Sequence, residues 1–176
     1  AANRVKLARH GLDQRAKEIN AKAAQLAIGL AHPRDALVAG SVGPLGTQLD
    51  ELRAAGFDPR SIFHEQIEAL CDEGVDAIIF ETFSDLEELK IALAAAQAIK
   101  KVPFICSMSF TEDGVTHAGV ALPDAFAALK SAGADIVGAN CCIGPHALVA
   151  LLKTKLPEIS PACQSAGRNF SISAYP

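Results

Sequence analysis

The sequence predicts an α/β protein built on a parallel sheet. Short apolar runs begin near residues 36, 76, 103, 134 and 170, and longer helical stretches separate them. A spacing of roughly 27 to 40 residues between such runs is expected for successive β/α units. The runs are continuously apolar instead of alternating, which is typical of parallel strands covered on both faces.

The first predicted element is an amphipathic helix over residues 4–30, interrupted at Gly11. Val5, Leu12, Ile19 and Leu26 lie a heptad apart and give this helix one apolar side. A short buried strand is expected next, over residues 36–40. It ends where the polar and glycine-containing stretch 41–46 begins.

Two helices with clear start signals flank the second strand. Asp58 provides an N-cap and Pro59 a first-turn proline for a helix that ends at Gly74. The second strand is expected over residues 76–80. Ser84 and Glu87 then match a capping box, which starts a helix that runs to about residue 100.

The rest of the chain repeats the same pattern. A polar, glycine-containing segment over residues 111–119 predicts a long loop after the third strand. The remaining predicted elements are a strand over 103–107, a helix from Pro123 to Gly133, a strand over 135–138, a helix from Gly144-Pro145 and a strand over 170–174.

Polar or nucleophilic side chains follow each predicted strand at its carboxyl end, where parallel α/β folds gather their chemistry. In chain order these residues are Ser41, Glu81-Thr82, Ser107 and Ser109, Asn140-Cys141-Cys142, and Tyr175. This regularity predicts a functional site at the strand ends.

Glu81 and Cys141 carry the most chemistry among these residues, and each has two interpretations. A strand-end carboxylate at Glu81 can hold a substrate ammonium or act as a general base, or it can bond the amides of the next loop. A thiolate at Cys141 suits zinc, whereas a buried free cysteine acts as a small hydrophobe. Adjacent extended residues point to opposite faces, so only one of Cys141 and Cys142 is expected to face the site. Position alone leaves both choices open.

Composition narrows the classes of function. The chain has 176 residues, of which 50% are hydrophobic, and a net charge of −4, which excludes intrinsic disorder. No apolar run reaches the ~18 residues that a membrane span needs, so no membrane partner is expected. A pI of about 5.7 argues against nucleic acid as a partner. Five cysteines without a CxxC pair, and no signal-like opening segment, favour the cytoplasm.

Four segments carry a resemblance to a known family: VAGSVGPLGT, IIFETFSDLEELKIAL, PFICSMSF and IVGANCCIGP. The sequence resembles the homocysteine S-methyltransferases, including the homocysteine-binding domain of cobalamin-dependent methionine synthase and betaine–homocysteine methyltransferase. The resemblance runs through nearly the whole chain and implies a (β/α)8 TIM barrel. It also implies transfer of a methyl group to the thiol of homocysteine, which forms methionine. The resemblance further implies a zinc ion that activates this thiol as a thiolate.

The resemblance assigns roles to three residues. Cys141 matches the zinc-binding cysteine of a GxNC motif, and Asn140 shapes the strand end beside it. Glu81 matches the glutamate that holds the amino group of the substrate. Ser41 is a substrate-binding candidate by its position alone, because with the nearby glycines it can bring the backbone close to a small anionic group such as a carboxylate. Cys142 matches no ligand position.

The sequence also departs from the family pattern. It lacks the Gly-Gly-Cys-Cys motif that supplies the other two zinc ligands, and it lacks the opening Asp-Gly-Ala-Met-Gly-Thr-type motif. We therefore expect residues 1–176 to form one partial barrel domain covering about strands 3–7. The remaining zinc ligands are expected outside this sequence, and the rest of the barrel or another chain is expected to complete it.

Three functions remain in competition. The first is a zinc-dependent methyltransferase whose methyl donor is a cobalamin or folate system, a sulfonium or betaine. The second is a non-catalytic barrel fragment or interaction module without bound metal. The third is another barrel enzyme that uses Glu81 as a base.

Overall fold

The computed structural model describes residues 2–99, 102–164 and 171–175. Five strands form one sheet in the order β1-β2-β3-β4-β5, which is the order of the sequence. Contacts within the backbone divide the chain into two compact units. The first comprises Ala1–Ile79 and Ala94–Pro103, and the second comprises Phe80–Leu93 and Phe104–Pro176. The second strand thus begins in the first unit and ends in the second.

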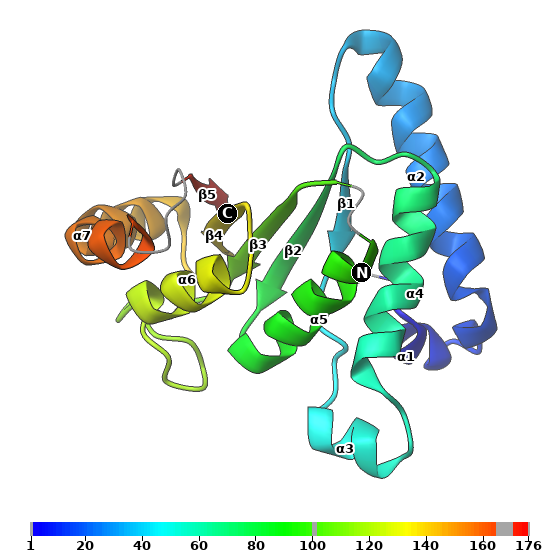
Figure 1. Ribbon diagram of the computed structural model, residues 1–176, viewed down its shortest axis with the longest axis horizontal. Helices are drawn as coiled ribbons and strands as arrows, with labels where there is room; N and C mark the ends of the chain where they lie inside the picture. The colour runs from blue at the N-terminus through cyan, green and yellow to red at the C-terminus, as the bar shows by residue number, and fades with distance from the viewer. Residues whose placement is uncertain (1, 100–101, 165–170, 176) are drawn as a thin grey trace. The chain divides into compact units, whose positions relative to one another are not determined.

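The first unit is mostly helical. Its elements are α1 (Arg4–Ala8), a 3-10 turn η1 (Asp13–Arg15), α2 (Ala16–Ala31), a 3-10 turn η2 (His32–Arg34), β1 (Ala39–Val42), α3 (Leu49–Ala54), α4 (Pro59–Asp72) and the start of β2 (Ala77–Phe83). Helices α2 and α4 lie side by side (Figure 1). The predicted break at Gly11 is confirmed, because Gly11 has φ +66° between α1 and η1.

The prediction of which side of the first helix is buried is wrong for α2, the second half of the predicted segment. The buried residues of α2 are Ala16, Asn20 and Ala24, whereas Leu26 is 71% exposed. Small side chains on the buried side allow α4 to pack closely. Asn20 is buried at that interface because its amide is satisfied there: Nδ2 donates to Ala16 O at 2.7 Å, and Oδ1 accepts from Gln66 Nε2 at 3.1 Å.

The start and end of α4 agree with the sequence prediction. Asp58 caps the helix, since its carboxylate accepts hydrogen bonds from the backbone N–H groups of Arg60 at 3.0 Å and Ser61 at 3.2 Å. Gly74, just after the helix, has φ +90°, a conformation that glycine adopts without strain.

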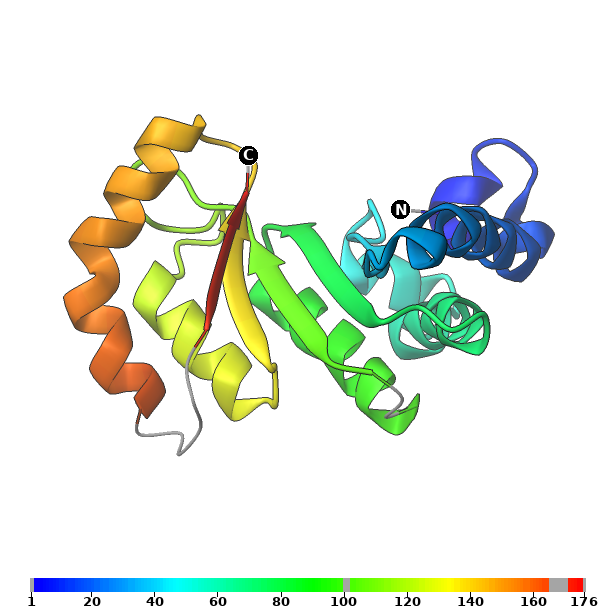
Figure 2. The ribbon, with the colours of Figure 1, turned by 90° about the horizontal axis from the view of Figure 1, so that it is seen from above.

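The second unit contains the end of β2 and the strands β3, β4 and β5, with helices packed against them. After the end of β2 it contains most of α5 (Leu86–Ile99), then β3 (Phe104–Met108), α6 (Leu122–Ser131), β4 (Ile136–Asn140), α7 (Pro145–Gln164) and β5 (Ile172–Tyr175). Strand β4 pairs in parallel with both β3 and β5. Helices α6 and α7 lie on one side of these strands (Figure 2). The predicted parallel α/β class is therefore confirmed.

One predicted helix cap is corrected. Asp85, and not Ser84, caps α5, because Asp85 Oδ1 accepts a hydrogen bond from the backbone N–H of Glu87 at 2.8 Å. Either residue type can cap a helix. Strand β2 continues to Phe83 instead of ending at residue 80, so the chain turns into the helix later than the sequence indicated.

Side chains of β3 separate into two faces. Cys106 and Met108 are buried, and Phe110 continues their face, where its ring packs edge-on against Phe126 of α6 at 6.0 Å between centroids. Ser107 and Ser109 alternate with these residues and therefore point to the opposite face, away from the helices. In the described part of the chain, no helix is both long and apolar enough to cross a membrane.

Candidate functional site

The carboxyl ends of β2 and β4 are joined by one buried side chain. Asn140, the last residue of β4, is 1% exposed and bonds Thr82 of β2 twice. Its Oδ1 accepts a hydrogen bond from the backbone N–H of Thr82 at 3.0 Å, and its Nδ2 donates to Thr82 Oγ1 at 3.0 Å. This pair lies within the second unit and fixes the strand ends that carry Glu81 and Cys141.

Cys141 follows Asn140 directly and lies in a polar environment. Its Sγ accepts a hydrogen bond from Asn140 Nδ2 at 3.2 Å and lies 3.5 Å from Thr82 Oγ1. The side chain is partly exposed. A thiol surrounded by hydrogen-bonding groups and open to solvent differs from a cysteine that serves as core filling. The geometry thus favours a chemical role for Cys141.

Cys142 lies in a tight turn and not in an extended strand. Cys141 and Cys142 have φ of +60° and +64°, and the N–H of Ile143 donates to Cys141 O at 2.8 Å. The expectation that the two side chains alternate across a sheet therefore does not apply, because alternation requires extended backbone. Cys142 is exposed.

Buried cysteines elsewhere in the chain contrast with this pair. Cys71 in α4 and Cys106 in β3 are both buried, and neither forms a disulfide. Burial raises the pKa of the Cys106 thiol well above its ordinary value. A thiol that stays protonated is neither a ready nucleophile nor a metal ligand, so Cys106 serves the core.

Glu81 lies within β2 and meets a residue from the far edge of the sheet. Tyr175, the last residue of β5, donates a hydrogen bond from its hydroxyl to Glu81 Oε2 at 3.2 Å, across 94 positions of sequence. Burial and the nearby charge of Glu81 raise the pKa of Tyr175, so the phenol keeps its proton. Thr82 and Tyr175 stand among the predicted strand-end residues, but the sequence did not mark either of them as a site residue.

The hydroxyl groups of Ser107 in β3 and of Ser109 just after it line the same face as Glu81 and Tyr175. Ser107 and Ser109 are buried. In the part of the chain that the structure describes, Ser109 Oγ is buried without a hydrogen-bond partner. A buried hydroxyl in that state is costly and is usually satisfied by a water molecule or a ligand. This face is therefore suited to a small polar molecule.

Ser41, the fourth predicted site residue, belongs to the first unit. It lies in β1, its side chain is exposed, and its carbonyl oxygen accepts a hydrogen bond from Gln66 Nε2 at 3.5 Å. The structure thus brings Glu81, Asn140 and Cys141 to the strand ends of one unit, and Ser41 to a strand of the other.

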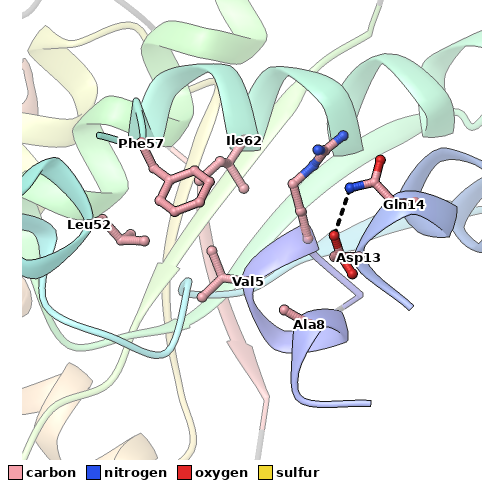
Figure 3. A pocket seen from close by; sticks show the side chains of 8 residues that line it. Val5, Ala8, Asp13, Gln14, Leu52, Phe57 and Ile62 are labelled. Carbon is pink, nitrogen blue, oxygen red and sulfur yellow. Dashed lines mark hydrogen bonds between the residues drawn. The ribbon is translucent and has the colours of Figure 1, made fainter. Parts of the chain in front are cut away.

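A separate cavity of about 280 Å³ lies in the first unit between α1, η1, α3 and α4 (Figure 3). Val5, Leu52, Phe57 and Ile62 form its apolar wall. Its polar side chains bond other side chains: Gln14 donates to Asp13 at 2.7 Å, and Arg4 pairs with Glu65. The cavity therefore offers apolar volume without a group prepared for catalysis.

The described residues offer a metal ion only part of a site. Among them, no group of three or more His, Cys, Asp or Glu side chains is arranged to hold a metal. Cys141 fits as a single thiolate ligand, since zinc prefers sulfur and nitrogen donors and Cys141 Sγ is accessible. A zinc site that includes Cys141 needs further ligands from outside the described residues.

Comparison with known proteins identifies the class of this fold and then the family. The solved structure of the metallated form of the homocysteine methyltransferase MmuM from Escherichia coli superposes with a TM-score of 0.67. It is 22% identical, and the match covers 98% of this chain and 71% of that one. This likeness shows the fold: a TIM-type β/α barrel, of which this chain covers a part. The predicted fold class is confirmed.

The family follows from sequence similarity. The family model for homocysteine S-methyltransferase matches residues 1–176. Betaine–homocysteine S-methyltransferase 1 of Rattus norvegicus is 32% identical over 137 residues, which are 78% of this chain and 33% of that protein. Methionine synthase of Mycobacterium leprae is 33% identical over 114 residues, 61% of this chain and 9% of that protein. The chain belongs to the homocysteine S-methyltransferase family, and it spans a third or less of these two relatives.

Proposed function

We propose that residues 1–176 form one partial homocysteine-binding barrel domain of a zinc-dependent homocysteine S-methyltransferase. The reaction is the transfer of a methyl group to the thiol of homocysteine, which gives methionine. The observation that carries this proposal is the Asn140–Thr82 pair, because it fixes a carboxylate, Glu81, and a partly exposed thiol, Cys141, near the carboxyl ends of β2 and β4. These two groups suit the two ends of homocysteine: an ammonium and a metal-bound sulfur.

Each residue has a distinct part in this proposal. The Glu81 carboxylate accepts hydrogen bonds from the substrate ammonium, an interaction strengthened by opposite charge. Asn140 holds the strand ends in place, and Ser41 contributes a substrate contact from β1. Cys141 supplies one thiolate to zinc. When bound, zinc lowers the pKa of the homocysteine thiol, so the sulfur stays a nucleophile at neutral pH.

The methyl donor and the rest of the zinc site lie beyond these residues. The name of the betaine–homocysteine relatives points to betaine as the donor, and a cobalamin or folate system and a sulfonium are the other candidates. We propose that the remaining zinc ligands and barrel strands come from other parts of the polypeptide or from another chain. Neither nucleic acid nor membrane takes part, and the free thiols suit the cytoplasm.

A cysteine pair in the chain provides a matched experiment. Cys141→Ser and Cys142→Ser remove adjacent thiols from the same turn, and only the first is a proposed ligand. Zinc content and methylation of homocysteine are measured in the full-length protein. We expect about one zinc per wild-type chain, loss of zinc and activity in C141S, and retention of both in C142S.

Two results would contradict the proposal. If C141S keeps its zinc and its activity, then Cys141 is no ligand. If the full-length wild type holds no zinc and methylates no thiol, then the competing function, a barrel module without metal chemistry, is the better description. The absence of a three-ligand cluster among the described residues is the observation that keeps this competitor open.

A further inference from the structure

Glu81 and Tyr175 meet across two intervening strands of the sheet. Glu81 lies on β2 and Tyr175 on β5, with β3 and β4 between them in the strand order. The Tyr175 hydroxyl nevertheless donates to Glu81 Oε2 at 3.2 Å. Both residues belong to the second unit. Side chains that reach each other over two strands need small residues beneath them.

The intervening strands provide that space. Ser107 of β3, Gly138 of β4 and Ser173 of β5 are aligned in register on the face that also carries Tyr175, two positions further along. A Cβ atom at Gly138 would lie 3.1 Å from Ser107 Oγ and 2.5 Å from Ser173 O. The absence of a side chain at Gly138 thus leaves a shallow surface over which Glu81 and Tyr175 meet.

The chemistry of the contact determines which residue donates the hydrogen bond. The phenol is the donor, because burial and the charge of Glu81 keep Tyr175 protonated. The carboxylate is the acceptor, and a hydrogen bond to an ionised group is stronger than one between neutral groups. The contact therefore restricts the orientation of a flexible glutamate side chain, which would otherwise lose rotamer freedom when it binds a ligand.

We propose that Tyr175 is a positioning residue that holds the Glu81 carboxylate in the orientation that binds a substrate ammonium group. Tyr175 thereby makes the site selective for thiols that carry an α-amino group over thiols that lack it. This inference rests on the proposed function, because it specifies which part of the substrate Glu81 recognises. Tyr175 acts through Glu81 and does not need to contact the substrate.

The test compares two thiols that differ only in the amino group: L-homocysteine and 4-mercaptobutanoate. Their dissociation constants are measured for the full-length wild type, Tyr175→Phe, Glu81→Gln and the double variant. We expect Y175F to weaken homocysteine binding roughly tenfold, the scale of one lost hydrogen bond to a charged group. Binding of 4-mercaptobutanoate is expected to stay unchanged. The double variant should bind homocysteine no more weakly than E81Q alone.

A merely structural role for Tyr175 gives a different pattern. In that case Y175F weakens the binding of both thiols equally, or of neither. If it weakens both, the double variant binds homocysteine more weakly than E81Q by the same factor that separates Y175F from the wild type. Either result overturns the inference. A wild type that binds homocysteine no better than 4-mercaptobutanoate overturns the proposed role of Glu81 as well, so the two failures are distinguishable.

A second variant keeps the inference testable if Y175F does not fold. Glu81→Asp retains the negative charge but shortens the side chain by one methylene, which takes the carboxylate out of reach of Tyr175. We expect E81D to lose the same preference for homocysteine. An E81D protein with wild-type preference would show that the contact with Tyr175 is not needed.

Discussion

Asn140 holds Thr82 in a backbone conformation that threonine rarely adopts. Thr82 has φ +65°, and both its backbone N–H and its Oγ1 bond the Asn140 side chain at 3.0 Å. Positive φ is a genuine outlier for a β-branched residue, with a cost on the order of 1–3 kcal/mol. Such strain persists where surrounding contacts determine the conformation, and it concentrates at functional sites. Here it places Thr82 Oγ1 beside Cys141 Sγ.

Substitutions at Thr82 separate the free-energy cost of its strained backbone from the contribution of its hydroxyl group to stability. Thr82→Ala and Thr82→Gly both remove the hydroxyl, but only glycine adopts positive φ without strain. We expect T82G to be more stable than T82A by about 1 kcal/mol. Chemical denaturation of the two variants measures this difference. Equal stability of the two variants would show that the Thr82 backbone is unstrained.

Thr154 provides the matched control for this comparison. It lies in the interior of α7 and its side chain is exposed. At a helical position glycine is less stable than alanine by about 1 kcal/mol. T154G is therefore expected to be less stable than T154A, which is the opposite order to that at Thr82.

Much of the fold was predictable because its signals are local. The N-cap at Asp58, the glycine after α4 and the apolar runs of the strands act over a few residues, so the sequence places them without knowledge of the rest of the chain. The apolar side of α2 was not predictable in this way. Asn20 is buried because Gln66 and the carbonyl of Ala16 bond its amide, and one of these partners is 46 residues away.

The candidate site also contains some residues that local sequence signals predict and others that only the pairing of the strands brings together. The rule that chemistry gathers at strand ends pointed to Glu81, Asn140 and Cys141, because it depends only on where each apolar run stops, although β2 itself continues two residues past Glu81. The partners of these residues depend on the pairing of the strands. Asn140 bonds Thr82 across 58 positions and Tyr175 bonds Glu81 across 94, so neither bond leaves a local sequence signal.

A carboxylate in the first unit makes stability depend on pH. Asp76 Oδ2 accepts hydrogen bonds from the backbone N–H of Val38 at 2.7 Å and from His32 Nε2 at 2.9 Å. The Val38 N–H, and after it the His32 side chain, lower the pKa of Asp76 in the folded state. Since the unfolded chain takes up this proton at higher pH, the stabilisation is fully present above a pH of about 4 and is lost as the pH falls.

Asp76→Asn removes this titration. We expect D76N to lower the free energy of unfolding at neutral pH and to flatten its decline between roughly pH 5 and pH 2. Urea denaturation over that range measures both effects. Asp50→Asn is the control, because the Asp50 side chain is 96% exposed. In this variant the free energy of unfolding should decline with pH as it does in the wild type. A D76N protein with an unchanged slope would remove Asp76 from the acid response.

The close approach of β4 and β5 at Gly138 determines where Tyr175 lies. A Cβ atom at this position would lie 2.5 Å from the backbone oxygen of Ser173, a distance that only movement of β5 can relieve. We expect Gly138→Ala to lower the free energy of unfolding by about 1–3 kcal/mol, as measured by chemical denaturation. Because Tyr175 follows Ser173 on β5, the same change should weaken homocysteine binding.

Gly29 is the control for this prediction, because a change from glycine to alanine is expected to stabilise the protein there. It lies in α2, and a Cβ atom there meets nothing within 4 Å. Gly29→Ala is expected to raise the free energy of unfolding by about 0.5–1 kcal/mol, because alanine favours the helix. If G138A were as stable as the wild type, β5 would tolerate displacement, and the alignment of Tyr175 with Glu81 would not depend on the missing side chain. If G138A is destabilised and G29A is not, the packing between β4 and β5 sets that alignment.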